Sequence, residues 1–171
     1  MTDLTSLFTD LVRTETRLYN RIDARLRAGH DMPLGTLEFL RIISTRPGCR
    51  VYDIAHEVDI TVGATSKGVD RLVARGWCER RANPDDRRSS LLFLTPAGEQ
   101  ALATATPTLE AAWAEQAAAL PGPVLAQLAD GLRLWRERLE SPGLPAEGAT
   151  GDGMAQPADA ELDHGGGPGT P

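Results

Sequence analysis

The chain has 171 residues, which is enough for one domain and a tail, and it carries a formal net charge of −6. The charge is unevenly distributed, because residues 1–49 and 50–98 each have a net charge of +1 and residues 99–171 have a net charge of −8. The acidic excess therefore lies in the last third of the chain, and the overall charge does not exclude a polyanionic partner for the remainder.

The sequence has the features of a protein of a reducing, cytoplasmic compartment. Its first residues, Met1 to Leu4, lack the basic and apolar regions of a signal peptide. No run of about 18 apolar residues occurs, which argues against a membrane span. Two cysteines, Cys49 and Cys78, cannot form a disulfide framework. We therefore expect a cytoplasmic protein without a membrane partner.

Hydrophobic side chains recur at helical spacing before residue 76. Thr61 has the side chain of an N-cap, and Gly76 ends the segment that Thr61 begins. The predicted helices in this part of the chain are 4–28, 34–45, 51–58 and 61–75.

Residues 80–98 have the composition of a hairpin followed by the start of a helix. Asn83-Pro84-Asp85-Asp86 favours a turn, and the run from Leu91 to Leu94 has the apolar character of a strand. The turn brings Arg87 and Arg88 to the tip of the hairpin. A basic tip of this kind is typical of a wing that follows the nucleic-acid backbone and inserts arginine into the minor groove.

Two further helices are expected after the hairpin. Thr95 is a suitable N-cap with Pro96 at the first helical position, where proline loses no hydrogen bond. Residues 101–120 and 124–139 have helical patterns, and Pro121-Gly122-Pro123 separates them.

The end of the chain, residues 141–171, is expected to be a disordered, acidic, Gly- and Pro-rich tail. It holds five Pro and eight Gly, with no aromatic residue, Val or Ile, and cannot bury enough apolar surface to offset its ordering entropy. Its five acids would repel non-specific DNA within a Debye length of about 8 Å, and the alternative is an inert extension.

The hairpin motifs resemble those of a known family. Asp86-x-Arg88-Ser89, followed by Leu94-Thr95-x-x-Gly98, resembles the wing signature of the MarR family of winged-helix transcriptional regulators. The resemblance covers roughly residues 33–100, whereas the flanking helices match by pattern alone. It extends upstream through Ile54-Ala55, Thr65-Ser66-Lys67, Val69-Asp70-Arg71-Leu72 and Gly76.

The resemblance implies a mainly α fold with a small β-hairpin wing, in which a winged helix-turn-helix is flanked by N- and C-terminal dimerisation helices. The MarR-like domain would cover residues 1–140, with dimerisation helices in 1–32 and 99–140 and the DNA-binding lobe in 33–98. It also implies a sequence-specific regulator of double-stranded DNA, acting as a ligand-responsive repressor and as a homodimer on a pseudo-palindromic operator. The alternative is a compact monomer whose terminal helices pack on the lobe.

The segment 61–75 is the expected recognition helix. Thr65, Val69 and Leu72 predict its buried face, and Gly68 predicts the close approach of another helix. Residues early on the opposite face should meet bases, and later ones should meet the backbone. Lys67 would donate to guanine, Ser66 to a base or phosphate, and Ala64 would contact a thymine methyl. The expected DNA-binding residues of this segment are Thr61, Gly63, Ala64, Ser66, Lys67, Arg71 and Arg75, the last two on phosphates or in ion pairs with Asp70 and neighbouring acids.

In the wing, Arg88 is the expected minor-groove residue, with Arg87 beside it. Asp86 is expected to hold the Arg88 guanidinium by charge-assisted hydrogen bonds. The alternative for Asp86 is that it fixes only the turn, with the two arginines forming a solvated basic tip. Asp86, Arg87 and Arg88 complete the set of expected DNA-binding residues.

The resemblance further implies a small effector, often an anionic aromatic molecule, bound between the dimerisation helices and the DNA-binding lobe. The residues that could line such a pocket are Arg17, Tyr19, His30 and Phe39.

Two other regulatory or binding roles compete with this reading. Cys49 lies beside Arg46 and Arg50, which would favour a thiolate and a redox sensor that uses Cys49 and Cys78; the alternative is two structural cysteines. A winged helix used only for protein contacts needs no positive wing tip. The chain shows no nucleophile elbow, phosphate loop or metal-ligand spacing, so we expect no enzyme, no cofactor and no metal.

Overall fold

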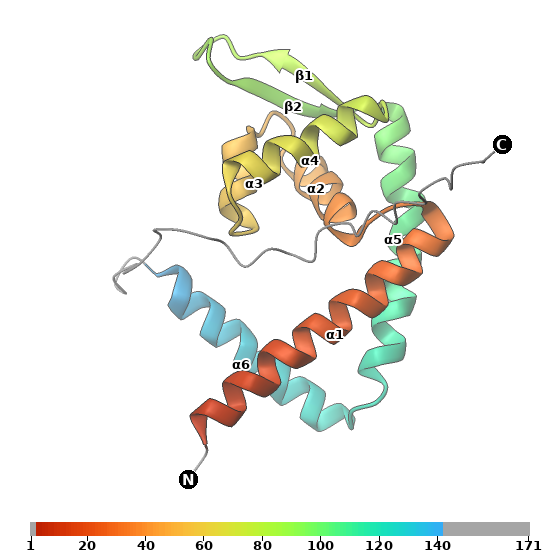
Figure 1. Cartoon of the computed structure of the whole chain (residues 1–171), viewed down its shortest axis with the longest axis vertical. Coiled ribbons are helices and arrows are strands. Elements are labelled where there is room, and N and C mark those ends of the chain that lie inside the picture. The colour runs from red at the N-terminus through yellow and green to blue at the C-terminus, as the bar shows by residue number, and fades with distance from the viewer. Residues whose placement is uncertain (1–2, 142–171) are drawn as a thin grey trace, which may run out of the picture. The chain divides into compact units, whose positions relative to one another are not determined.

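The computed structural model describes residues 3–141, and within that range it contains helices and one hairpin (Figure 1). The predicted fold class, mainly α with a small β-hairpin, is confirmed. None of the helices in this range combines the length and apolarity of a membrane span. The elements are α1 (Leu4–His30), α2 (Leu34–Thr45), α3 (Val51–Glu57), α4 (Val62–Ala74), β1 (Cys78–Ala82), β2 (Ser90–Leu94), α5 (Pro96–Ala117) and α6 (Gly122–Glu140).

A hydrophobic core joins α2, α3, α4 and the hairpin into one lobe, and the same core continues to α1 and α5. The contact between α2 and α4 explains the glycine inside α4, because a Cβ on Gly68 would collide with the ring of Phe39. The close approach predicted at Gly68 is therefore confirmed, as is the predicted buried face of this helix. The fully buried side chains of the lobe include Leu37, Leu40, Ile43, Ile54, Thr65, Val69, Leu72 and Leu92.

The hairpin is antiparallel, with Cys78 opposite Leu94 and Ala82 opposite Ser90. The middle of β2 is attached to the segment before α3 by two backbone hydrogen bonds of Leu92. The N–H of Leu92 donates to the carbonyl of Cys49 over 2.9 Å, and the N–H of Gly48 donates to the carbonyl of Leu92 over 2.8 Å. The wing is thus fixed to the lobe at the middle of β2, and its tip extends away from the lobe (Figure 1).

The start of α5 is fixed against the turn that follows α4. The hydroxyl of Thr95 accepts the N–H of Gly98 over 3.1 Å and donates to the carbonyl of Gly76 over 2.6 Å. Gly98 has no room for a side chain, because a Cβ would collide with the carbonyl oxygen of Trp77. The N-cap predicted at Thr95 is confirmed.

Helix α5 begins at the predicted first helical position and ends before the predicted residue 120. It begins at Pro96, directly after its N-cap, and ends at Ala117 rather than at the Pro121-Gly122-Pro123 break. The reason for the early end is a tighter last turn: Leu120 donates to the carbonyl of Ala117 three residues back.

The long helix α1 packs against α5 and against α2. Ile22 and Leu26 are its buried residues. The helix extends two residues beyond the predicted 28, to His30, and its C-cap Asp31 adopts the left-handed conformation with φ of 48°. Its contact with α5 carries two side-chain links at the surface, Arg21 to Gln116 and Arg25 to Glu115, each 2.7 Å long.

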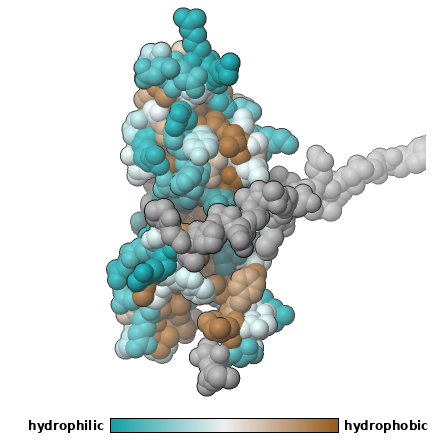
Figure 2. Space-filling model, turned by 90° about the vertical axis from the view of Figure 1, so that its left-hand side faces the viewer, coloured by the Kyte–Doolittle hydropathy of each residue, from teal (hydrophilic) through white to brown (hydrophobic). Residues whose placement is uncertain are grey.

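The last helix, α6, has no buried residue. Apolar side chains recur along one face of it at helical spacing, and each is between 44% and 65% exposed. Figure 2 shows hydrophobic side chains at the surface in the half of the molecule that holds α6 and the start of α1. The side chains of this exposed apolar face are Val124, Leu128, Leu132, Trp135 and Leu139 on α6, and Leu4, Leu7 and Phe8 are exposed at the start of α1. The predicted tail, from residue 142 onward, lies outside the described residues.

Candidate nucleic-acid interface

The first part of the candidate site is the exposed face of α4. Thr61 caps this helix, its hydroxyl accepting the N–H of Ala64 over 3.2 Å. Because Thr65, Val69 and Leu72 are buried, helical geometry turns the opposite face outward. The residues on the exposed side include Gly63, Ala64, Lys67, Asp70 and Arg71, whereas Ser66 is half-buried.

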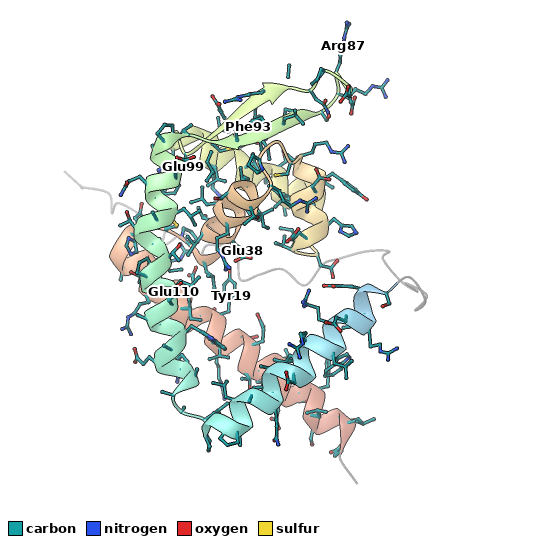
Figure 3. The ribbon with its side chains drawn as sticks, turned by 180° about the vertical axis from the view of Figure 1, so that it is seen from behind. Tyr19, Glu38, Arg87, Phe93, Glu99 and Glu110 are labelled. Carbon is teal, nitrogen blue, oxygen red and sulfur yellow. The ribbon has the colours of Figure 1, made fainter. Side chains whose placement is uncertain are left out.

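The second part is the wing tip, which side-chain hydrogen bonds hold in a defined turn. The Asn83 carbonyl oxygen accepts the N–H of Asp85 over 3.0 Å, and the Asp86 carboxylate accepts the N–H of Arg88 over 2.9 Å. The Asn83 amide also donates to the Ser89 hydroxyl over 2.9 Å. Arg87 lies at the outermost point of the hairpin and is directed away from the rest of the molecule (Figure 3).

The hydrogen bond to Arg88 corrects the role predicted for Asp86. Its carboxylate bonds the backbone N–H of Arg88, rather than the guanidinium. A carboxylate two residues before an N–H closes an Asx-turn, which is the local arrangement that aspartate favours. Asp86 therefore fixes the turn, as the alternative interpretation had it, and leaves the Arg88 side chain free to extend outward.

The cations of this lobe divide into two groups, paired and free. Arg46 pairs with Glu57 over 2.8 Å, Arg80 with Asp70 over 2.8 Å, and Arg81 with Glu79. Arg50 pairs with Asp53 over 3.1 Å, which holds the pKa of the Asp53 carboxyl below its usual range. The other group has no ion pair within residues 3–141, and it consists of Lys67 and Arg71 on α4 and Arg87 and Arg88 on the wing tip.

Arg75 belongs to the paired group, and its partner is Asp31 rather than the predicted Asp70. Its guanidinium donates to the carbonyl and to the carboxylate of Asp31, each over 2.7 Å, and lies 4.8 Å from the centre of the Trp77 ring. The side chain is directed to the end of α1 because Arg75 is the C-cap of α4, beyond the exposed face that Lys67 occupies. Asp70 instead pairs with Arg80.

Two features of this surface were not identified from the sequence. One is the link between α4 and the wing through Asp70 and Arg80. The other is Tyr52, an exposed aromatic residue on α3 whose ring centre lies 6.3 Å from that of His56. Helical spacing from the buried Ile54 and Ala55 could have predicted that the Tyr52 side chain is exposed. No local pattern in the sequence predicts the ion pair between Asp70 and Arg80.

The four residues expected to line an effector pocket have different surroundings. Phe39 is buried between α2 and α4, and the His30 ring lies 2.7 Å from the Thr108 hydroxyl of α5. Tyr19 is half-buried next to Gly35, and burial raises the pKa of its hydroxyl. Arg17 is exposed on α1.

A surface hollow of about 360 Å³ lies elsewhere, between α1 and α5. Its floor includes the buried Ile22 and Ala112. The links from Arg21 to Gln116 and from Arg25 to Glu115 form its polar rim. None of the four predicted residues lines it.

The proposed activation of Cys49 by its arginine neighbours is wrong. Burial and the nearby Asp53 carboxylate raise the pKa of the Cys49 thiol to about 11, and the opposing effect of the Arg46 charge is smaller. Burial also raises the pKa of the Cys78 thiol. Both cysteines are free and belong to the hydrophobic core. Among the described residues, no group of three or more His, Cys, Asp or Glu side chains is arranged to hold a metal ion.

Comparisons with known proteins identify relatives of this fold. A family model described as "MarR family" matches residues 33–90. The multiple antibiotic resistance protein MarR of Salmonella typhimurium is 31% identical over 104 residues, which are 57% of this chain and 72% of that protein. The HTH-type transcriptional regulator BilQ of Clostridium symbiosum is 36% identical over 67 residues, 39% of this chain and 46% of that protein.

A solved structure has the same fold. Sco3205, a MarR family transcriptional regulator from Streptomyces coelicolor that was crystallised in complex with DNA, superposes with a TM-score of 0.72. The superposition covers 81% of this chain and 88% of Sco3205, at 23% identity. The agreement extends beyond residues 33–90 and therefore includes helices outside the winged-helix lobe.

Proposed function

The chain belongs to the MarR family, and we propose that it is a transcriptional regulator that binds double-stranded DNA through α4 and the wing. In this arrangement α4 enters the major groove and the wing tip follows the adjacent minor groove. The relatives named above are transcriptional regulators, so the family supports binding rather than catalysis.

The observation that carries this proposal is the distribution of free cations. Phosphate contacts require basic side chains that are not already neutralised. In the winged-helix lobe, Lys67, Arg71, Arg87 and Arg88 satisfy this condition, and they belong to α4 and the wing tip. Paired arginines occupy the rest of the lobe. A surface used only for protein contacts gives no reason for this division.

We assign the contacts by their place on the two elements. Lys67 reads guanine, Ser66 contacts a base or a phosphate, and Ala64 contacts a thymine methyl, because early residues of a recognition helix reach base edges. Arg71 contacts phosphate, and Arg88 enters the minor groove with Arg87 beside it. Thr61 and Gly63 are assigned to the DNA backbone, which the start of α4 approaches.

Selection of bound duplexes from a randomised DNA pool tests the proposal. We expect a pseudo-palindromic sequence to be enriched, with half-sites whose centres are about 34 Å apart. Recovery of no preferred sequence, together with equal binding of all duplexes or of none, would contradict sequence-specific binding.

The dimer belongs to the same proposal, and the exposed apolar face of α6 supports it. Its side chains, like Leu4, Leu7 and Phe8 of α1, are large apolar groups that are each at least 44% exposed, and apolar side chains gathered at a surface mark interaction sites. Contact with the same face of a second copy would bury it around a two-fold axis. Light scattering at micromolar concentration should give the mass of a dimer, and a monomer that binds DNA one to one would overturn this part.

We further propose that the protein is a repressor released by a small anionic effector. The hollow between α1 and α5 supports this, because its volume is in the range of ligand sites and it combines an apolar floor with arginine side chains. Titration of the selected DNA complex with small aromatic carboxylates tests this proposal. Release of DNA that is abolished by Arg21→Ala would support the hollow as the site, and release that is unchanged by this substitution would exclude it.

A further inference from the structure

The exposed face of α4 carries a negative charge where a DNA-binding surface should have none. Asp70 lies one helical turn after Lys67, on the side opposite the buried Val69 and Leu72. It does not pair with Lys67, and its side chain is 65% exposed. An uncompensated carboxylate at this position would repel the phosphates that flank the major groove.

Arg80 of β1 neutralises this carboxylate. Its Nη2 atom lies 2.8 Å from Oδ1 of Asp70, and its Nη1 atom donates to the Ser90 hydroxyl over 3.2 Å. One guanidinium therefore connects the recognition helix to both strands of the wing. Its side chain is 31% exposed, less than those of the other arginines in ion pairs of the described chain.

We infer that Asp70 and Arg80 are positioning residues that determine DNA specificity, and this inference rests on the proposed DNA-binding function. The pair holds the wing at a fixed angle to α4. The major-groove contacts of α4 and the minor-groove contacts of the wing can therefore form together only on DNA whose grooves match that angle. The pair also keeps the Arg80 guanidinium away from phosphates, where it would bind every sequence equally. Asp70 therefore contributes to specificity by limiting non-specific affinity.

The two partners should have opposite effects when each is removed. Asp70→Asn frees Arg80 for a phosphate, so binding to scrambled DNA should tighten and the slope of log K against log salt should steepen by about 0.9 per protomer. Arg80→Gln leaves Asp70 unpaired opposite the DNA, so binding to every duplex should weaken, by about tenfold at low salt for a dimer.

The double variant Asp70→Asn/Arg80→Gln separates charge from geometry. It has the net charge of the wild-type protein, so its salt slope and its affinity for scrambled DNA should return to the wild-type values. The angle of the wing is no longer fixed, so binding to the selected duplex should remain weaker than that of the wild-type protein. A pair that acted only through its charges would give full recovery on both duplexes.

The experiment uses the full chain, a duplex recovered from the randomised pool and a scrambled duplex of the same length and composition, each titrated over a range of salt. Asp130→Asn and Arg133→Gln are the control variants, because they remove the partners of an exposed 2.8 Å ion pair on α6. Thermal unfolding of each variant monitors folding, and an exposed pair of this kind contributes little to stability.

Three results are distinguishable. Opposite effects of Asp70→Asn and Arg80→Gln, absent from the control pair, support the inference. Wild-type binding with an unchanged ratio of selected to scrambled affinity in Asp70→Asn overturns it, as does full recovery of binding to both duplexes in the double variant, which would mean that the pair acts through its charges alone. Failure of the wild-type protein to bind either duplex overturns the proposed function and this inference with it.

Discussion

The winged-helix lobe and helix α6 differ in the side chains that they leave without a partner: the lobe exposes unpaired cations, and α6 exposes apolar side chains. The lobe buries its apolar side chains in a hydrophobic core that it shares with α1 and α5, and it leaves cations free at α4 and the wing tip. Helix α6 has no buried residue and leaves an apolar face at the surface. A free cation is satisfied by an anion, and an apolar face by another apolar surface. The two regions therefore fit the two partners that we propose, which differ in chemistry: DNA for the lobe and a second copy of the chain for α6.

The largest effect is expected from Leu132→Asp, which places a charge on the exposed apolar face of α6. An uncompensated charge buried in the α6 contact costs about 3–5 kcal/mol, and a two-fold axis doubles the number of charges. We expect a monomer by light scattering at micromolar concentration, with the helix content retained.

Ala126→Asp is the matched control, because residue 126 lies on the opposite side of α6 and is exposed. It should remain dimeric. The same mass for both variants would mean that the apolar face is not the contact between copies.

The second effect concerns the charged side of the comparison. Arg88→Ala should weaken binding to all duplexes and reduce the salt slope by about 0.9 per protomer, since one cation leaves the minor groove. Asp86→Ala should cause part of the same loss by releasing the turn that Asp86 fixes through the Arg88 N–H. Salt titrations that are unchanged in both variants would show that the wing tip does not contact DNA.

A third experiment compares a free cation with a paired one. Lys67→Ala should reduce discrimination between selected and scrambled duplexes by about 1–3 kcal/mol, as expected for a lost base contact. Arg75→Ala should leave the salt slope unchanged, because the Arg75 guanidinium is held by Asp31. Equal losses for Lys67→Ala on both duplexes would refute base reading, and a shallower slope for Arg75→Ala would show that its ion pair opens on DNA.

The smallest effect concerns the buried thiols of Cys49 and Cys78, which are expected to contact neither DNA nor a second copy of the chain. Because burial raises the pKa of Cys49 to about 11, the thiolate is scarce at neutral pH, and alkylation by iodoacetamide should be slow in the folded protein. The raised pKa also means that the stabilisation from the neutral thiol is present below the unfolded-state value and is lost as the pH rises toward 11. Mass spectrometry that detected rapid labelling at pH 7 would contradict this burial.

Local signals in the sequence predicted much of the lobe. Thr61 and Thr95 are caps that hydrogen-bond within three residues, and the buried face of α4 follows from spacing alone. The hairpin followed from its turn residues in the same way. These features depend on neighbours in the chain, so composition and period are enough to find them.

Features that depend on residues far apart in the chain were missed. Arg75 contacts Asp31, 44 positions earlier, and this choice of partner depends on where α1 ends. Spacing along α4 predicted that Arg75 could pair with Asp70, but the hairpin brings Arg80 to Asp70 instead. The hollow between α1 and α5 joins residues about 90 positions apart, so no spacing in the sequence could indicate it.

The salt dependence of binding to the selected duplex tests the division of cations most directly. Four free cations per protomer make eight in a dimer, so the slope of log K against log salt should lie between about −4 and −7. A variant carrying Lys67→Gln, Arg71→Gln, Arg87→Gln and Arg88→Gln should bind with a slope near zero, while the paired arginines remain in place. A slope in that variant close to the wild-type value would contradict the assignment of DNA binding to these four side chains.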